Sequence, residues 1–178
     1  MRTGIAGVGG IGSNVAVNLV RSGVTDLTLI DFDLVEPSNL NRQFYFADQI
    51  GKPKVEMLAA NLKRIDPGVN LVTRCTRLDN GNLETLFGDC DIIVEGFDRS
   101  EDKKMVLELL GPLKKLTVSA CGIAGLELDA ITTRKIGNCF VVGDFTRDIH
   151  DHPLFCCKVA AVAAKMAEIV LTYGGYND

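Results

Sequence analysis

Short apolar runs alternate with longer segments in which apolar residues recur at helical spacing, over most of the chain. The first run ends at Gly7, and a helix is predicted over residues 8–21 because Ser22 and Gly23 form a stop signal. The same reasoning predicts strands at 26–30, 69–75 and 90–95, and helices at 54–65, 80–87 and 100–115. Strands that alternate with helices predict a parallel sheet with right-handed crossovers.

The pattern changes after residue 115, where three apolar runs follow with no helix between them. Residues 116–121, 126–133 and 139–142 are predicted to form the last parallel strand and an antiparallel extension. A polar loop over 150–157 and an alanine-rich helix over 158–173 come next. Together these elements predict a Rossmann-like, doubly wound α/β fold with a mainly parallel sheet, in one domain over residues 1–178.

The composition narrows the classes of partner. A chain of 178 residues that is 47% hydrophobic can bury a sizeable core. Its net charge of −4 gives no electrostatic basis for binding nucleic acid or an anionic membrane. No signal peptide opens the chain, and the apolar run at 159–171 is too short to span a membrane and contains Lys165 and Glu168. We therefore expect a cytoplasmic protein.

The cysteines lack the paired C-x-x-C spacing of a structural zinc site or a thioredoxin-like motif. The six cysteines are Cys75, Cys90, Cys121, Cys139, Cys156 and Cys157. Most of them are expected to be reduced thiols that pack as small hydrophobic residues.

The first strand leads into a glycine-rich turn of the form G-x-G-x-x-G. Gly7, Gly9 and Gly12 make up this motif, and Gly10 lies within it. Glycines there let backbone amides approach a phosphate at the N-terminus of the next helix. Asp31 follows the second strand at the distance where a carboxylate accepts hydrogen bonds from ribose hydroxyls. This combination predicts a nucleotide site, although many unrelated nucleotide-binding proteins share it.

Further motifs follow in a fixed order and are much more specific. They are Gly7-Val-Gly-Gly-Ile-Gly-Ser13, Asp31-Phe-Asp-Leu-Val-Glu-Pro-Ser-Asn-Leu-Asn-Arg-Gln43, Gly51-Lys-Pro-Lys54 and Gly96-Phe-Asp98. The set closely resembles the ThiF/MoeB/HesA family, related to the ubiquitin-activating enzymes. The resemblance implies ATP- and Mg²⁺-dependent adenylation of the C-terminal glycine of a ubiquitin-like sulfur-carrier protein that ends in Gly-Gly. It also implies a homodimer, and the short chain is similar to the ThiF branch of thiamin biosynthesis, whose carrier is ThiS.

The resemblance also assigns roles to residues. It implies that Gly7, Gly9, Gly10 and Gly12 surround the nucleotide, that Asp31 holds the ribose, and that Asn39 and Arg42 meet the phosphates. Lys54 would lie at the α-phosphate, and Asp98 would bind Mg²⁺, which makes Arg42, Lys54 and Asp98 the expected catalytic residues. Asp33 is included among the nucleotide-binding residues, with a structural role in its loop as an equal alternative. Lys52 is expected to be the exposed lysine of its motif.

Three questions stay open at this point. Relatives that form a persulfide or thioester use a cysteine in a mobile segment, for which residues 144–157 and the thiols of Cys156 and Cys157 are the candidates. A second interpretation is a scaffold of the same fold that binds nucleotide or carrier without catalysis. It arises because relatives have a segment before the first strand that lends an arginine to the ATP site of the neighbouring subunit. This sequence begins at the first strand, so a complete site of this kind is not expected from it. A weaker third interpretation is an NAD-binding oxidoreductase, which fits the glycines and Asp31.

Overall fold

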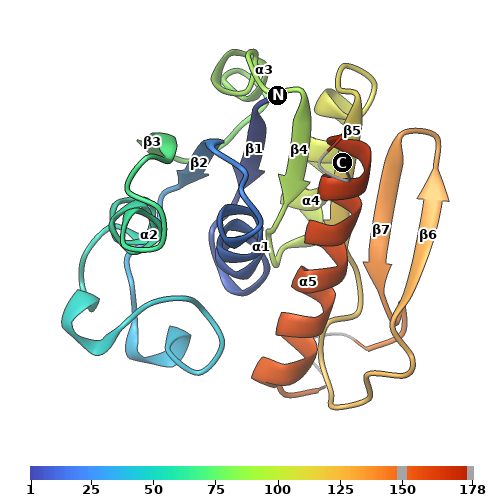
Figure 1. Cartoon of the computed structure of the whole chain (residues 1–178). Coiled ribbons are helices and arrows are strands. Elements are labelled where there is room, and N and C mark those ends of the chain that lie inside the picture. Colours follow the sequence, from blue (N-terminus) through green and yellow to red (C-terminus); the bar gives the residue numbers. More distant parts are fainter. Residues whose placement is uncertain (148–151, 176–178) are drawn as a thin grey trace.

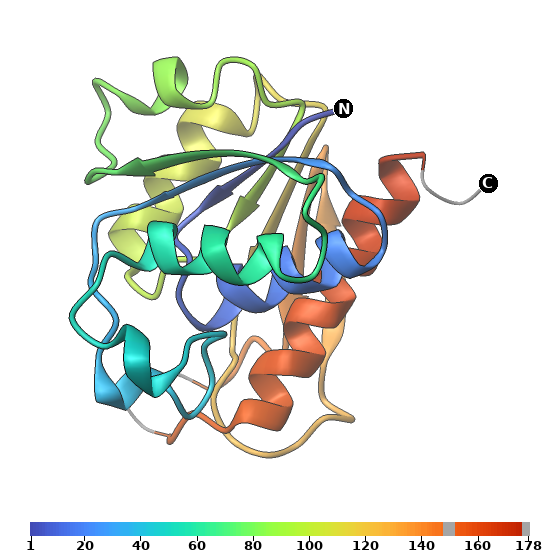
Figure 2. The ribbon, with the colours of Figure 1, turned by 60° about the vertical axis from the view of Figure 1, so that its left-hand side comes forward.

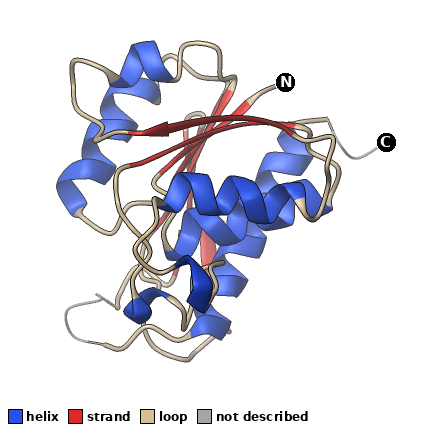
Figure 3. Ribbon diagram, turned by 90° about the vertical axis from the view of Figure 1, so that its left-hand side faces the viewer, coloured by secondary structure: helices blue, strands red, loops and turns tan. Residues whose placement is uncertain are grey.

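The computed structural model describes residues 1–147 and 152–175. A single seven-stranded sheet runs through it, with helices on both faces (Figures 1 and 3). The strands are β1 (Thr3–Ala6), β2 (Asp26–Asp31), β3 (Asn70–Cys75), β4 (Ile92–Glu95), β5 (Leu116–Ala120), β6 (Thr132–Ile136) and β7 (Cys139–Gly143). The helices are α1 (Gly10–Arg21), α2 (Lys54–Lys63), α3 (Leu83–Leu86), α4 (Ser100–Leu110) and α5 (Cys156–Tyr173), with short 3₁₀ turns at Pro37–Asn39 and Ala47–Gln49.

The strand order is β3-β2-β1-β4-β5-β7-β6, and all neighbouring strands are parallel except the β6–β7 pair. The chain builds outward from β1 to β3 and then returns to place β4 on the other side of β1. A sheet of this kind binds ligands where the order reverses, outside the carboxyl ends of its strands. The structure thus confirms the doubly wound, mainly parallel fold with an antiparallel pair near the C-terminus.

The two faces of the sheet bury different helices. Successive strand residues point to opposite faces, so Ile5 of β1 packs with α1, α2 and α5 while its neighbour Ala6 packs with α3 and α4. Both side chains are fully buried. Helices α1 and α5 lie side by side on their face (Figures 1 and 2). This packing fixes the start of α1, and therefore the glycine turn, relative to the sheet.

The predicted strand at 126–133 was wrong, because β6 begins only at Thr132. Leu126 and Leu128 lie in bends of the loop before it, with 56% and 45% of their surface exposed. Every residue of β6 is exposed, because the strand lies at the edge of the sheet. An exposed edge strand needs no apolar side chains, so the apolar run was a poor guide to its position.

Each predicted helix differs from the observed one at one boundary or more, and α3 spans only Leu83–Leu86 where 80–87 was predicted. Helix α4 ends at Leu110, where Gly111 follows, and α5 begins at Cys156, within the predicted loop. In the described part of the chain, no helix is both long and apolar enough to cross a membrane.

The expectation that most cysteines are packed inside was wrong. All six thiols are free, and only Cys90 is buried, while Cys75, Cys121, Cys156 and Cys157 are exposed.

Candidate functional site

A cavity of about 320 Å³ opens at the carboxyl ends of the central strands. Its wall brings together residues that lie far apart in the sequence, from the turns after β1, β2, β3 and β4 and from the segment before α2. Eight of the predicted site residues line it: Gly7, Gly9, Gly10, Asp31, Asp33, Arg42, Lys54 and Asp98. Gly12 and Asn39 do not.

The glycine turn shapes the part of the cavity above β1. Gly7 has a φ of +83°, a conformation that residues with a side chain rarely adopt. Helix α1 begins at Gly10, and no side chain caps its N-terminus. The first amides of a helix lack partners within the helix and attract anions. This turn therefore offers a phosphate-binding surface.

Gly12 has a different role from its neighbours in the motif. A Cβ atom at this position would lie 1.9 Å from the carbonyl oxygen of Gly7. Gly12 therefore allows α1 to pack closely on the turn, and the structure does not place it at the cavity wall. Its predicted contact with the nucleotide stays a prediction.

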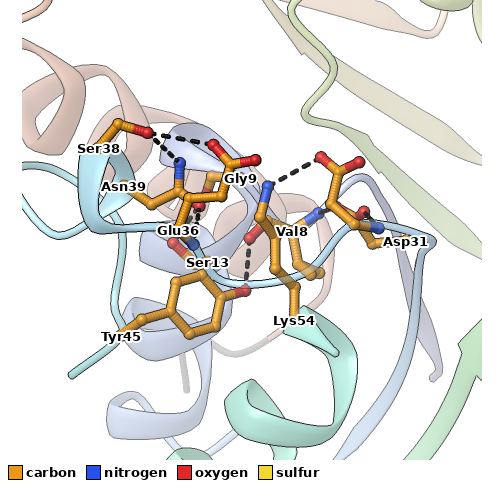
Figure 4. A network of polar contacts seen from close by, with 10 residues as sticks. Val8, Gly9, Ser13, Asp31, Glu36, Ser38, Asn39, Tyr45 and Lys54 are labelled. Atoms are coloured by element: carbon orange, nitrogen blue, oxygen red, sulfur yellow. Dashed lines mark hydrogen bonds and ion pairs between the residues drawn. The ribbon is translucent and has the colours of Figure 1, made fainter. Parts of the chain in front are cut away.

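Asp31 ends β2 and lies on the cavity wall with only 7% of its surface exposed. Its carboxylate accepts hydrogen bonds from the backbone N–H groups of Val8, at 2.7 Å, and Asp33, at 2.8 Å (Figure 4). Burial raises the pKa of this carboxyl, and the hydrogen bonds and the nearby Lys54 charge oppose that shift without cancelling it. Each carboxylate oxygen has a second lone pair, so Asp31 can still accept a hydrogen bond from a ligand hydroxyl.

Lys54 is the first residue of α2, and its side chain is only 8% exposed. Its ammonium group lies 2.9 Å from the carboxylate of Asp33. Backbone hydrogen bonds hold the two segments together, from Lys54 N–H to the Asp33 carbonyl and from Val35 N–H to the Lys52 carbonyl. Lys52 itself is exposed, as predicted. A lysine kept this close to the cavity by burial and one ion pair is placed to meet an anionic ligand.

The segment between β2 and α2 folds around a short 3₁₀ turn that Asn39 stabilises. The side-chain oxygen Oδ1 of Asn39 accepts a hydrogen bond from the backbone N–H of Glu36 at 3.0 Å, so the side chain supports the turn. Its predicted phosphate contact stays a prediction. Arg42 is half-buried and lines the cavity beside Gly10. The side chain of Asn14 donates to the Arg42 carbonyl at 2.8 Å, which ties this segment to α1.

Tyr45 fixes the same segment from below (Figure 4). Its hydroxyl donates to the Val8 carbonyl at 2.7 Å. Burial, together with the charges of Asp31 and Asp33, raises the pKa of Tyr45 above its ordinary value, so it stays a neutral donor. Arg42 and the glycine turn are thus held in one rigid unit.

Asp98 follows β4 and lies on the cavity wall opposite Asp31. Within the described residues its carboxylate makes no hydrogen bond or ion pair, so both oxygens are available. The turn that carries it is anchored by Glu95, which is fully buried and accepts the N–H of Phe97 at 2.6 Å. Glu95 also pairs with Lys103 and accepts the hydroxyl of Ser119.

The oxygens of Asp98 suit Mg²⁺, which is often held by one or two carboxylates together with substrate phosphates and water. Asp102, in the first turn of α4, lines the same cavity. Residues 1–147 and 152–175 contain no group of three His, Cys, Asp or Glu side chains placed to hold a metal ion by themselves. A Mg²⁺ ion at Asp98 would therefore need further ligands from a bound nucleotide.

Several residues of the wall were not predicted: Phe32, Gln43, Arg77, Phe97, Arg99 and Asp102. Phe32, Phe97 and Arg99 lie shortly after the ends of predicted strands, and this position was a usable signal. Gln43 follows Arg42 and is buried, and its side-chain carbonyl oxygen has no hydrogen-bond partner among the described residues. Arg77 had no local signal, because only the pairing of β3 with β2 brings it to the cavity.

A smaller cavity of about 200 Å³ adjoins the first and shares Phe97, Asp98 and Ile123 with it. Cys121, Lys103 and Arg147 contribute to its wall. Cys156 and Cys157 are exposed at the start of α5 and line neither cavity. The candidate mobile segment falls partly on residues 148–151, which lie outside the described residues.

Comparison with known sequences identifies relatives of this chain. The profile of the ThiF family matches residues 1–167. An adenylyltransferase and sulfurtransferase, UBA4, from Candida glabrata is 33% identical over 139 residues, which cover 76% of this chain and 32% of that protein. The molybdopterin-synthase adenylyltransferase of Haemophilus influenzae is 33% identical over 120 residues, covering 67% of this chain and 49% of that protein. The chain therefore spans half or less of the length of these relatives.

Comparison with solved structures supports the same fold. The tRNA N6-threonylcarbamoyladenosine dehydratase TcdA of E. coli, in complex with ATP, superposes with a TM-score of 0.86 at 17% identity, covering 99% of this chain and 88% of that one. MccB of E. coli superposes with a TM-score of 0.78 at 22% identity, covering 99% of this chain and 57% of that one. At these identities the likeness shows the fold alone.

Proposed function

Because the chain belongs to the ThiF family, we propose that it is an ATP- and Mg²⁺-dependent nucleotidyltransferase. Its substrate in this proposal is the C-terminal glycine of a ubiquitin-like sulfur-carrier protein that resembles ThiS. The carboxylate of that glycine attacks the α-phosphorus of ATP, the bond to the bridging oxygen breaks, and pyrophosphate leaves. The product is an acyl-adenylate on the carrier.

The observation that carries this proposal is the position of Lys54. Its ammonium group is nearly buried, pairs with Asp33 and lies on the same cavity wall as Arg42 and the glycine turn. Attack of a carboxylate on a phosphate brings two anions together, so positive charge must be held in place where negative charge develops. Arg42, Lys54 and the N-terminus of α1 supply such positive charge at the wall of this cavity.

The remaining residues position the reactants. Asp31 accepts hydrogen bonds from the ribose, and the glycine turn surrounds the phosphates. Asp98 is the residue that would hold Mg²⁺, which neutralises phosphate charge when bound. No general base is needed, because a C-terminal carboxylate is already ionised at neutral pH.

The names of the relatives support adenylyl transfer as the reaction. Two of them are called adenylyltransferases, and one is also called a sulfurtransferase. We infer from the resemblance of its motifs that the pathway is thiamin biosynthesis, that the protein acts in the cytoplasm and that it is a homodimer. Cys156 and Cys157 stay candidates for a later sulfur step.

The test is exchange of labelled pyrophosphate into ATP, with Mg²⁺, in the presence and absence of a carrier that ends in Gly-Gly. We expect exchange only when the carrier is present. Lys54→Gln should reduce its rate by about 100-fold or more, because one charge that stabilises the transition state is lost. The matched control is Lys52→Gln. It removes the same charge from an exposed lysine that lies two residues before Lys54.

Two results would contradict the proposal. ATP binding without any carrier-dependent exchange would favour a scaffold that binds nucleotide without turnover. Equal loss of exchange in Lys52→Gln and Lys54→Gln would show that Lys54 has no special role. A fluorescence titration with NADH tests the oxidoreductase alternative, and we expect no binding.

A further inference from the structure

The ring of Phe32 and the guanidinium group of Arg77 lie together on the wall of the main cavity. The guanidinium carbon is 5.4 Å from the centre of the ring, within the range of a cation–π contact. Phe32 keeps 47% of its surface exposed. Within the described residues, the Arg77 side chain makes no hydrogen bond. The pair therefore presents a flat, partly apolar and positively charged surface that the core does not use.

The sheet places this pair at one end of the cavity. Asp31 at the end of β2 pairs with Cys75 at the end of β3, so Phe32 and Arg77 both follow these paired ends. The glycine turn lies above β1, the next strand, and Asp98 follows β4 beyond it. Across the cavity the order is thus Arg77 and Phe32, then Asp31, then the glycine turn, then Asp98.

If the phosphates and the ribose of a nucleotide occupy the positions of the proposed function, the position of its base follows. This step rests on the proposed function, in which the phosphates contact Arg42, Lys54 and the start of α1, and the ribose contacts Asp31. The base then continues beyond Asp31, toward the end of β3. We propose that Phe32 and Arg77 form the surface that binds the purine base of the nucleotide.

The chemistry of the two side chains fits this role. Aromatic rings and guanidinium planes both stack on the faces of bases. Arginine carries hydrogen-bond donors and no acceptor, so its partners on a purine are the ring nitrogens that accept hydrogen bonds. Arg77 and Phe32 thus hold the base, while the other residues of the site hold the sugar and the phosphates.

The test is calorimetric titration of the whole chain with two ligands, MgATP and magnesium tripolyphosphate, which lacks the base and the sugar. We expect Arg77→Gln and Phe32→Leu each to weaken ATP binding by about tenfold, the size of one stacking contact. Neither substitution should change the affinity for tripolyphosphate. Unchanged tripolyphosphate binding also shows that each variant is folded, because the phosphate site is intact.

The matched control is Arg74→Gln, because Arg74 is an exposed arginine of β3 that does not line the cavity and donates to the Thr73 carbonyl. This control should bind both ligands like the wild type. Equal weakening of ATP and tripolyphosphate in Arg77→Gln would assign Arg77 to the phosphates and overturn the inference. ATP affinity that does not change in either variant would also overturn it. Failure of the proposed function would be seen in a different experiment. In that case ATP would bind in the titration, but the carrier would cause no pyrophosphate exchange.

Discussion

The ammonium group of Lys158 lies 2.5 Å from the carboxylate of Asp144, and both side chains are almost completely buried. Lys158 belongs to the first turn of α5, while Asp144 directly follows β7. Lys158 also donates to the Ala124 carbonyl at 2.6 Å. The other oxygen of Asp144 accepts the N–H groups of Thr146 and Arg147. One ion pair therefore joins the start of α5 to the wall of the smaller cavity, to which Thr146 and Arg147 belong.

Removing one member of this pair should cost far more stability than removing both. Lys158→Met leaves a buried carboxylate without its cation, and we expect a loss of about 3–5 kcal/mol in the free energy of unfolding. Asp144→Asn should also destabilise the protein, because it leaves the ammonium group unpaired. The double variant should lose clearly less than the sum of the two single losses, as urea unfolding would measure. Additive losses would show that the two groups do not interact.

The same pair predicts how stability depends on pH. Burial alone would raise the pKa of Asp144, but hydrogen bonds from Lys158, Thr146 and Arg147 and the Lys158 charge lower it from 3.8 to about 2. A carboxyl with a lowered pKa in the folded state stabilises the protein above pH 3.8, and this stabilisation is lost as the pH falls through about 2. The advantage of the wild type over Asp144→Asn should therefore narrow by about 2 kcal/mol between about pH 5 and pH 2. An advantage that stays constant over this range would contradict the shifted pKa.

The glycines of the turn allow folding and binding to be separated. In Gly12→Ala the new methyl group would lie 1.9 Å from a backbone oxygen that cannot move alone, and we expect a loss of about 3 kcal/mol or more in stability. At Gly9 the nearest atom to a new Cβ is the side-chain nitrogen of Gln43 at 3.8 Å, and φ is −76°. Gly9→Ala should therefore lose much less stability than Gly12→Ala.

Gly9→Ala should instead weaken ATP binding, by about tenfold or more, because Gly9 lines the cavity where phosphates need close approach to the backbone. Thermal unfolding and calorimetric titration of the two variants would check both halves of this prediction. If Gly9→Ala bound ATP like the wild type, the phosphates would lie elsewhere in the cavity. If Gly12→Ala were as stable as the wild type, the close packing of α1 on the turn would not matter.

Local patterns were sufficient for the parallel strands of the sheet and for much of the site. The glycine turn, Asp31 and Asp98 each follow a strand that the apolar pattern located, and parallel strands bring their carboxyl ends to one edge. Lys54 was separated from Lys52 only through its motif. The structure supplies the physical reason, because pairing of the backbone around Val35 and Lys52 turns Lys54 toward Asp33.

Tertiary contacts determine the features that the sequence could not reveal. Arg77 reaches the cavity because β3 pairs with β2. Asn39 supports a 3₁₀ turn with its side chain, which a motif cannot distinguish from a residue that contacts phosphate. The position of β6 was missed because its side chains are all exposed, while apolar Leu126 and Leu128 lie in bends of the loop before it.

Asp98 gives the most direct test of the metal site, because its exposed carboxylate lines the cavity and makes no hydrogen bond or ion pair with any described residue. Asp98→Asn keeps the size of the side chain and removes the charge that attracts Mg²⁺. We expect carrier-dependent pyrophosphate exchange at saturating Mg²⁺ to fall by about 100-fold or more, and the Mg²⁺ concentration for half-maximal rate to rise. Glu101→Gln removes one charge from an exposed residue in the first turn of α4, close to Asp98 in the sequence, that does not line the cavity, so it should leave both quantities unchanged. An Asp98→Asn variant with the Mg²⁺ dependence of Glu101→Gln would exclude Asp98 as the metal ligand and would direct attention to Asp102.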